Sequence, residues 1–149
     1  KSYPIIKKHN KKSLSFVNSV VIAFRRNSII SNKVFFDENF GLGSTFQTAD
    51  EYVFLRNALN LNLNIVFHNE VILSHPVDSS GKDVASDRIL FAKGALFYKY
   101  YNILSFIKLI HYLYLMFKFK YISLGQIFNK YFVGVKGIIK YIKVNNEKK

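Results

Sequence analysis

Two adjacent carboxylic residues and one histidine are the side chains of this sequence best suited to chemistry. Asp50 and Glu51 open a segment with helical spacing, and a carboxylate there can be a general base that removes a proton from a hydroxyl group. The pair also has a structural interpretation, because acidic residues in a first turn interact favourably with the helix dipole. His75 ends an apolar segment just before Pro76, a place suited to a metal or phosphate ligand or to a purely structural histidine.

A pair of glycines offers a second kind of site. Gly41 and Gly43 stand in the turn-forming segment 35–44, FFDENFGLGS. Glycine accepts a positive φ and carries no Cβ, so the backbone here can approach a ligand closely; an ordinary turn is the alternative. The sequence contains no cysteine, which excludes a cysteine nucleophile and a cysteine-ligated metal.

The elements expected to position these residues include both strands and helices. Segments 15–24 and 65–73 are rich in β-branched and aromatic residues, which predicts two strands. Apolar residues at helical spacing predict a helix over 48–61, with Thr48 and Glu51 in the pattern of a capping box. The remaining expectations are a short helix over 26–31, a loop over 75–87, and helices from residue 88 with a break at 123–125. We therefore expect a mixed α/β fold followed by a helical tail.

The order of these segments resembles the acceptor-side half of inverting family-2 glycosyltransferases of the GT-A fold. Family members show a strand followed by an arginine-rich helix start, then an F-D-E-x-F-G-x-G loop, then an acidic pair that opens a helix, then a strand that ends in a histidine. The matching segments are VNSVVIAFRR (17–26), FDENFGLG (36–43), ADEYVFLRNAL (49–59) and IVFHNEVILSHP (65–76). The resemblance implies the GT-A fold for this part of the chain.

The resemblance also implies roles for individual residues. The family's acidic motif reads Glu-Asp, with the aspartate as catalytic base, so here Glu51 takes the base position and Asp50 is its partner. His75 corresponds to the histidine that helps to hold the metal–diphosphate of the nucleotide. The implied substrate-binding residues are Gly41, Leu42, Gly43 and Arg25.

The implied reaction transfers a sugar from a nucleotide-diphospho-sugar to a hydroxyl acceptor, with inversion at the anomeric carbon. A divalent cation, Mg²⁺ or Mn²⁺, would offset the charge that develops on the leaving phosphate. The family holds this cation mainly through an Asp-x-Asp motif, which does not occur in this sequence and is expected upstream of Lys1. We therefore expect residues 1–88 to be the acceptor and catalytic-base half, and we expect the chain alone to be inactive.

The charge of the chain is concentrated in its second half. The sequence has 22 basic and 9 acidic residues, a net charge of +13. Residues 1–88 carry +3 of this, whereas residues 89–149 hold eleven lysines against Glu147 alone. This shift in composition predicts a separate basic tail over 89–149. Its longest uncharged run, 109–117, has 9 residues, too few for a membrane span of about 20.

The tail has the pattern of an interfacial helix. Drawn as a helix, residues 126–143 place Lys136, Lys140 and Lys143 on one face. The opposite side is apolar, with Ile127, Phe128, Tyr131, Val135, Ile138 and Ile142. A basic face against an apolar face is typical of helices that lie on anionic lipid, although helices that close onto their own domain with a solvated lysine face are the alternative. We expect a protein attached peripherally to the inner face of the cell membrane, acting on a saccharide or lipid-linked acceptor in surface-polysaccharide or glycolipid assembly.

Two other classes of function are open to this composition. A pI near 9.9 with interleaved Tyr and Phe residues is compatible with a nucleic-acid-binding module. The lysines stand among bulky aliphatic residues and only four arginines are present, so we expect no nucleic-acid partner. A non-catalytic interaction domain is the third alternative.

Overall fold

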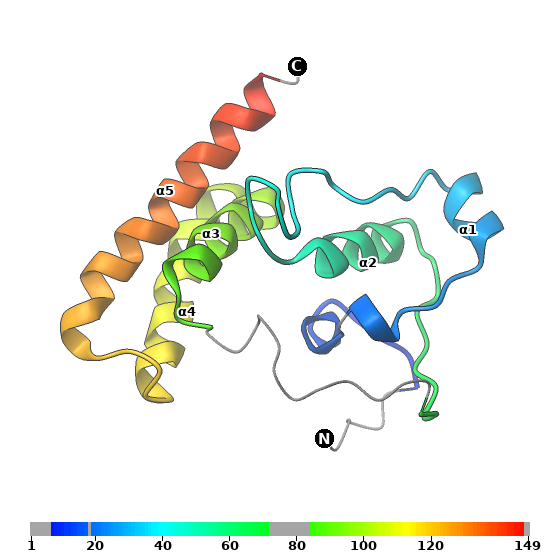
Figure 1. Ribbon diagram of the computed structural model, residues 1–149, viewed down its shortest axis with the longest axis horizontal. Coiled ribbons are helices and arrows are strands. Elements are labelled where there is room, and N and C mark those ends of the chain that lie inside the picture. Colours follow the sequence, from blue (N-terminus) through cyan, green and yellow to red (C-terminus); the bar gives the residue numbers. More distant parts are fainter. Residues whose placement is uncertain (1–6, 18, 72–83, 148–149) are drawn as a thin grey trace. The chain divides into compact units, whose positions relative to one another are not determined.

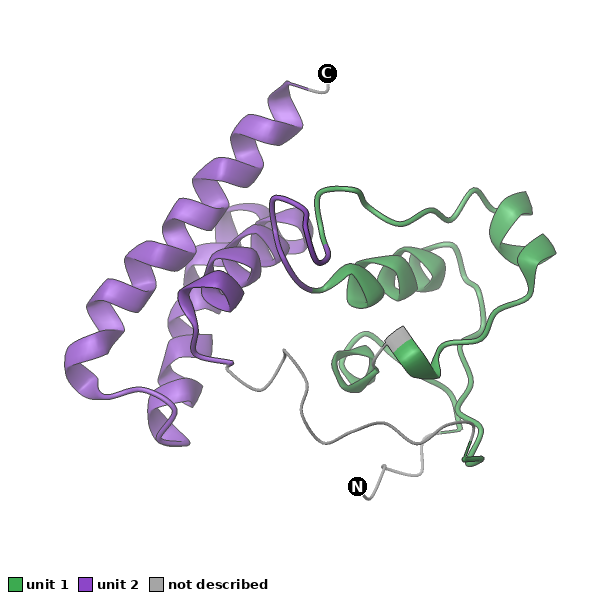
Figure 2. Ribbon diagram, viewed as in Figure 1, with its two compact units in different colours: residues 1–40, 49–77 green, residues 41–48, 78–149 purple. Residues whose placement is uncertain are grey.

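The computed structural model describes residues 7–17, 19–71 and 84–147 (Figure 1). The chain forms two compact units (Figure 2). Unit 1 comprises residues 1–40 and 49–77, and unit 2 comprises residues 41–48 and 78–149. The division into residues 1–88 and 89–149 that the change in composition predicted stays a prediction.

Short helices form the described part of unit 1. These are the 3-10 helices η1 (Ser13–Phe16) and η2 (Ser19–Val21), and the α-helices α1 (Arg26–Ser31) and α2 (Asp50–Asn60). Helix α1 confirms the helix predicted over 26–31, and α2 lies within the one predicted over 48–61.

The core of unit 1 is built around Phe54 of α2. The buried residues that surround one another here are Leu14, Val34, Phe54, Leu55 and Ala58. The Phe36 ring stacks on the Phe54 ring with 4.3 Å between centroids, and the Phe24 ring lies 5.6 Å from it. Contact of the partly exposed Phe24 and Phe36 rings with the buried Phe54 ring attaches the irregular segments before α2 to the helix.

The expected mixed α/β fold is wrong, and with it the GT-A architecture: the described residues form helices and no sheet. Residues 15–24 contain η1 and η2 in place of the first predicted strand. Between residues 65 and 71 of the second, the structure shows only an isolated antiparallel bridge, Lys8 to Val66. Residues 72 and 73 of that strand lie outside the described residues.

An asparagine turn starts η1 at the front of the predicted first strand. The Asn10 side-chain oxygen accepts hydrogen bonds from the backbone N–H groups of Lys12 (2.9 Å) and Ser13 (3.1 Å). Asn10 also accepts a bond from Leu14 N through its backbone carbonyl. These local bonds compete with extended structure and start η1. The β-branched residues that follow favour a strand only where a neighbouring strand offers them a pleated surface.

Three long helices form the described part of unit 2. Its elements are α3 (Asp87–Tyr101), η3 (Asn102–Leu104), α4 (Ser105–Lys118), η4 (Leu124–Gln126) and α5 (Ile127–Asn146). Their shared core contains Leu90, Leu109, Leu113, Met116, Ile122 and Ile138. The helical tail and its break at 123–125 are confirmed. At the break, Ser123 N donates to Gln126 Oε1 over 2.9 Å in a capping box.

Glycines bring α3 and α5 into backbone contact. A Cβ added to Gly94 would lie 1.9 Å from the carbonyl oxygen of Gly134, and one added to Gly137 would lie 1.9 Å from that of Phe91. No side chain fits at these two positions without moving a helix.

Residues 41–48 belong to unit 2, although residues of unit 1 flank them on both sides. Phe46 is fully buried, with its ring centroid 5.6 Å from that of Phe91 and 5.9 Å from that of Tyr141. The Arg88 guanidinium donates to the Gln47 carbonyl over 2.8 Å. This loop is thereby held on α3 and α5.

Helices α1, α2 and α4 end in the same hydrogen-bonded motif. The second residue after each helix has a positive φ: Lys33 (51°), Asn62 (60°) and Lys120 (60°). After α4, Lys120 N donates to Phe117 O and Tyr121 N donates to Met116 O, both over 2.9 Å. This is the Schellman motif, in which glycine usually takes the left-handed position.

Within the described residues, no helix has both the length and the apolar character needed to cross a membrane.

Candidate functional site

The carboxyl pair predicted to be catalytic forms the first turn of α2. The Asp50 and Glu51 side chains are hydrogen-bonded to each other. Partial burial, this hydrogen bond and the charge of Glu51 raise the pKa of Asp50, while hydrogen bonds from the backbone N–H groups of Asp50 and Glu51 act in the opposite direction. Carboxyl groups with perturbed pKa values are characteristic of sites of acid–base chemistry.

The predicted capping box at Thr48 is wrong. The N-cap is Ala49, which has a φ of 71° and makes no side-chain cap hydrogen bond. Thr48 instead donates its backbone N–H to the Phe46 carbonyl over 2.7 Å. A left-handed alanine costs about 1 kcal/mol or more, and such strain is concentrated at functional sites. The entrance to α2 is therefore held in a strained conformation directly before the carboxyl pair.

The glycine pair lies on a closed turn in unit 2. Gly41 N donates to the Phe46 carbonyl over 2.9 Å, and the Ser44 hydroxyl donates to the Gly41 carbonyl over 2.7 Å. Gly41 and Gly43 have φ of 116° and 81°, the left-handed region that favours glycine. The Leu42 side chain at the tip is 76% exposed. These contacts account for the glycines as turn residues, and substrate binding by the turn stays a prediction.

Much of the FDEN segment before this turn is structural. The Asp37 carboxylate accepts hydrogen bonds from Asn39 N (3.0 Å) and Asn39 Nδ2 (2.8 Å), and Phe40 N donates to the Asp37 carbonyl. Arg25 is the exposed N-cap of α1, and its carbonyl accepts a hydrogen bond from Ile29 N. Substrate binding by Arg25 stays a prediction.

His75 lies outside the described residues, so its distance from Glu51 stays untested. Among the described residues, no three His, Cys, Asp or Glu side chains gather in a group that fits a metal ion. The expected Mg²⁺ or Mn²⁺, with His75 as a ligand, stays a prediction.

The structure brings the predicted site residues together in two groups. Asp50 and Glu51 form one group in unit 1, and the turn with Gly41, Leu42 and Gly43 forms the other in unit 2. A single cleft that holds both groups stays a prediction.

Comparisons of the chain with protein-family models, with curated proteins and with solved structures found no match.

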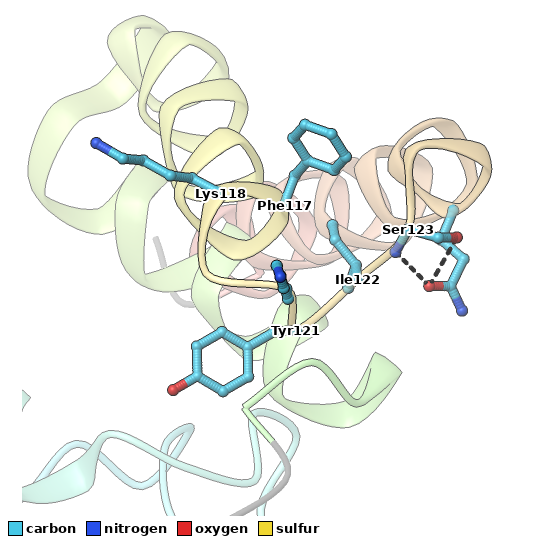
Figure 3. Close-up of a pocket in the computed structure, with 7 residues that line it drawn as sticks. Phe117, Lys118, Tyr121, Ile122 and Ser123 are labelled. Atoms are coloured by element: carbon cyan, nitrogen blue, oxygen red, sulfur yellow. Dashed lines mark hydrogen bonds between the residues drawn. The ribbon is translucent and has the colours of Figure 1, made fainter.

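The described residues of unit 2 form a hollow of about 560 Å³ where α4 turns toward α5 (Figure 3). Its walls include Phe117, Tyr121 and Ile122 together with the exposed cations Lys118 and Lys120. The close-up shows Lys118, Phe117 and Tyr121 pointing in different directions from this turn. The turn therefore combines aromatic surface with positive charge.

The apolar side of α5 is largely covered by the protein itself. Ile138 is fully buried, and Tyr131 and Ile142 are half-buried against the core of unit 2. The exposed lysines Lys136 and Lys140 point away from this core. Of the predicted apolar side of α5 only Phe128 is highly exposed, so most of that side is occupied by the core of unit 2 and is not available to lipid.

Two cations that the sequence analysis missed lie in the helices. Arg56 of α2 is only 6% exposed, and its guanidinium donates to the Tyr52 hydroxyl over 2.9 Å. Lys93 of α3 is half-buried, and burial lowers the pKa of its ammonium group. Helical periodicity could have indicated both, because each stands on an otherwise apolar side of its helix.

Proposed function

We propose that the protein is a glycosyltransferase in which Glu51, paired with Asp50, acts as the general base. The observation that supports this is the hydrogen-bonded carboxyl pair directly after the strained Ala49. Because Thr48 is not the N-cap of α2, the capping box that competed with catalysis for Glu51 is absent. The sequence motifs of the resemblance support the same reaction, whereas the strands that the family shows beside them are absent among the described residues.

In this proposal the Glu51 carboxylate takes the proton of an acceptor hydroxyl. The hydroxyl oxygen then attacks the anomeric carbon of a nucleotide-diphospho-sugar, the bond to the diphosphate breaks, and the configuration inverts. Burial and the neighbouring Glu51 raise the pKa of Asp50, so a proton is held more readily on Asp50 than on an isolated aspartate, and Glu51 is the proposed base. A bound divalent cation would stabilise the negative charge of the leaving diphosphate.

The test is the variant Glu51→Gln in the intact natural protein. Release of nucleoside diphosphate is measured with a panel of nucleotide-sugars and a membrane fraction as acceptor. Loss of a general base lowers kcat by about 10²–10⁴-fold, with nucleotide binding close to that of the wild type. Glu147→Gln, at an exposed glutamate that follows α5, is the matched control and leaves transfer unchanged. Equal losses of transfer and of nucleotide binding would instead assign a structural role to Glu51.

The proposal includes a location at the inner face of the cell membrane, with a lipid-linked acceptor. Its support is electrostatic. Between Arg88 and Asn146 the sequence has no acidic residue, and Lys136, Lys140 and Lys143 are exposed on α5. Exposed lysines near an anionic leaflet contribute about 1 kcal/mol each to attachment.

A further inference from the structure

Helix α4 has two apolar sides, and only one of them is covered. Leu109, Leu113 and Met116 pack into the core of unit 2. The other side carries Ile107, Ile110, Tyr114 and Phe117, which are 65, 56, 55 and 40% exposed. At 100° per residue these four positions fall within about 80° of arc, so they form one continuous stripe, here called the outer face of α4.

We propose that the outer face of α4 enters the headgroup region of an anionic membrane, with Lys118 and Lys120 placed on lipid phosphates. The inference rests on the membrane location proposed above and names the surface that makes the contact. Because the opposite side of α4 is buried in unit 2, the helix can offer only this stripe, and it would lie along the membrane surface.

The end of α4 has the side chains that such a surface needs. The run from Phe117 to Tyr121 alternates aromatic residues with Lys118 and Lys120, and all five residues are exposed. Aromatic rings are enriched at the level of the lipid headgroups, and lysines there attract anionic lipid. The aromatic and cationic walls of the hollow in Figure 3 come from this run.

Lys120, like Lys33, has the left-handed position of a Schellman motif that glycine usually takes, and it differs from Lys33 in standing between two exposed aromatic residues. A lysine at this position costs stability in the folded chain. Its positive charge between Phe119 and Tyr121 is the feature that binding to lipid phosphates would use.

A second copy of the chain is the other occupant that the stripe could accept. The spacing of three and four residues is that of a coiled-coil seam. Contact between two such faces would bring the lysines of both copies together, with no acidic residue between Arg88 and Asn146 to compensate them. An anionic membrane offers the opposite charge to the same residues, which favours lipid.

A single tryptophan can report on insertion directly. The sequence contains no tryptophan, so Tyr114→Trp introduces a unique fluorophore on the outer face. On vesicles of phosphatidylcholine with phosphatidylglycerol, its emission shifts to shorter wavelength and brominated lipid quenches it. Val66→Trp, at a position that is 54% exposed in unit 1, is the control and shows neither change. Unchanged emission from Tyr114→Trp on vesicles that bind the protein would overturn the assignment.

A triple variant tests the contribution of the face to binding. Ile107→Gln, Ile110→Gln and Tyr114→Gln together lower partition into these vesicles by at least about tenfold, because exposed apolar area is lost. The matched control, Phe35→Gln, Leu61→Gln and Val66→Gln, removes three side chains of similar exposure (66, 48 and 54%) and leaves partition unchanged. Circular dichroism establishes that both variants keep their helices.

The outcomes separate this inference from the proposals on which it stands. A wild type that ignores anionic vesicles overturns both the membrane location and the role of α4. A wild type that binds, with the α4 variant bound equally well, overturns only the assignment of this face. A dimer in lipid-free buffer that the α4 variant dissociates would assign the face to self-association. Glycosyl transfer to a soluble acceptor is unaffected by each of these results.

Discussion

Gly94 of α3 lies so close to Gly134 of α5 that a Cβ on Gly94 would stand 1.9 Å from the Gly134 carbonyl oxygen. Gly137 meets the Phe91 carbonyl in the same way one helical turn along α5. The contact is between backbones, so a flexible side chain cannot move aside to relieve it. The approach of these two helices thus depends on the absence of two methyl groups.

Gly94→Ala should therefore destabilise unit 2 by about 3 kcal/mol or more, because α3 and α5 must move apart. Gly137→Ala should have a similar effect. Gly125→Ala is the control, since a Cβ there meets nothing within 4 Å. Urea unfolding measures all three variants, and a Gly94→Ala variant as stable as Gly125→Ala would show that the helices can repack without cost.

Lys120→Gly should change stability and membrane binding in opposite directions. Glycine relieves the left-handed strain and stabilises the protein by about 1 kcal/mol, while loss of the charge weakens binding to vesicles with phosphatidylglycerol. Lys33→Gly is a matched control, because Lys33 occupies the same Schellman position after α1 with a φ of 51°. It should gain stability and keep its vesicle binding. Equal losses of binding in both variants would contradict a specific role for Lys120.

The pH dependence of stability should depend on Asp50. Its raised pKa means that the folded state binds this proton more tightly than the unfolded state does. The stabilisation is complete below the ordinary pKa of 3.8 and is lost as the pH rises through the raised value. Asp50→Asn does not titrate, so the free energy of unfolding of the wild type should fall relative to it across this window. If thermal unfolding gives the wild type and Asp50→Asn parallel pH profiles, folding does not raise the pKa of Asp50.

Reversal of the α5 lysines should weaken attachment without abolishing insertion. Lys136→Glu, Lys140→Glu and Lys143→Glu together turn three attractive charges into repulsive ones and should lower binding to anionic vesicles by more than about tenfold. Lys8→Glu, Lys11→Glu and Lys12→Glu change the net charge equally from exposed positions in unit 1. Co-sedimentation at low and high salt compares the two. Equal losses would mean that net charge alone, and not the lysines of α5, sets the affinity.

The helices of this chain could be predicted from local signals, and the absence of a sheet could not. The helices over 26–31, 48–61 and 126–143 follow from periodicity within single segments, and all three are present. A strand depends on a partner, and the start of the predicted strand instead belongs to η1, which begins where Asn10 accepts hydrogen bonds from Lys12 N and Ser13 N.

The site could be predicted only in part for a related reason. The position of Asp50 and Glu51 at the start of a helix was evident from the sequence, but their shared hydrogen bond and the left-handed Ala49 depend on the geometry of the fold. On α5, periodicity separated the lysines from the apolar side correctly. It did not indicate that Ile138 would be buried in the chain's own core while the outer face of α4 stayed exposed.

The excursion of residues 41–48 into unit 2 limits how the protein can be dissected. The backbone passes between the two units at residues 40–41, 48–49 and 77–78, so no single cut separates them. A truncated product that starts at residue 78 keeps α3, α4 and α5 but lacks Phe46, which leaves the facing rings of Phe91 and Tyr141 uncovered. The helical half is therefore not an exchangeable cassette. A chimera that transplants it must carry the octapeptide GLGSTFQT along, for example as a fused segment at its amino end.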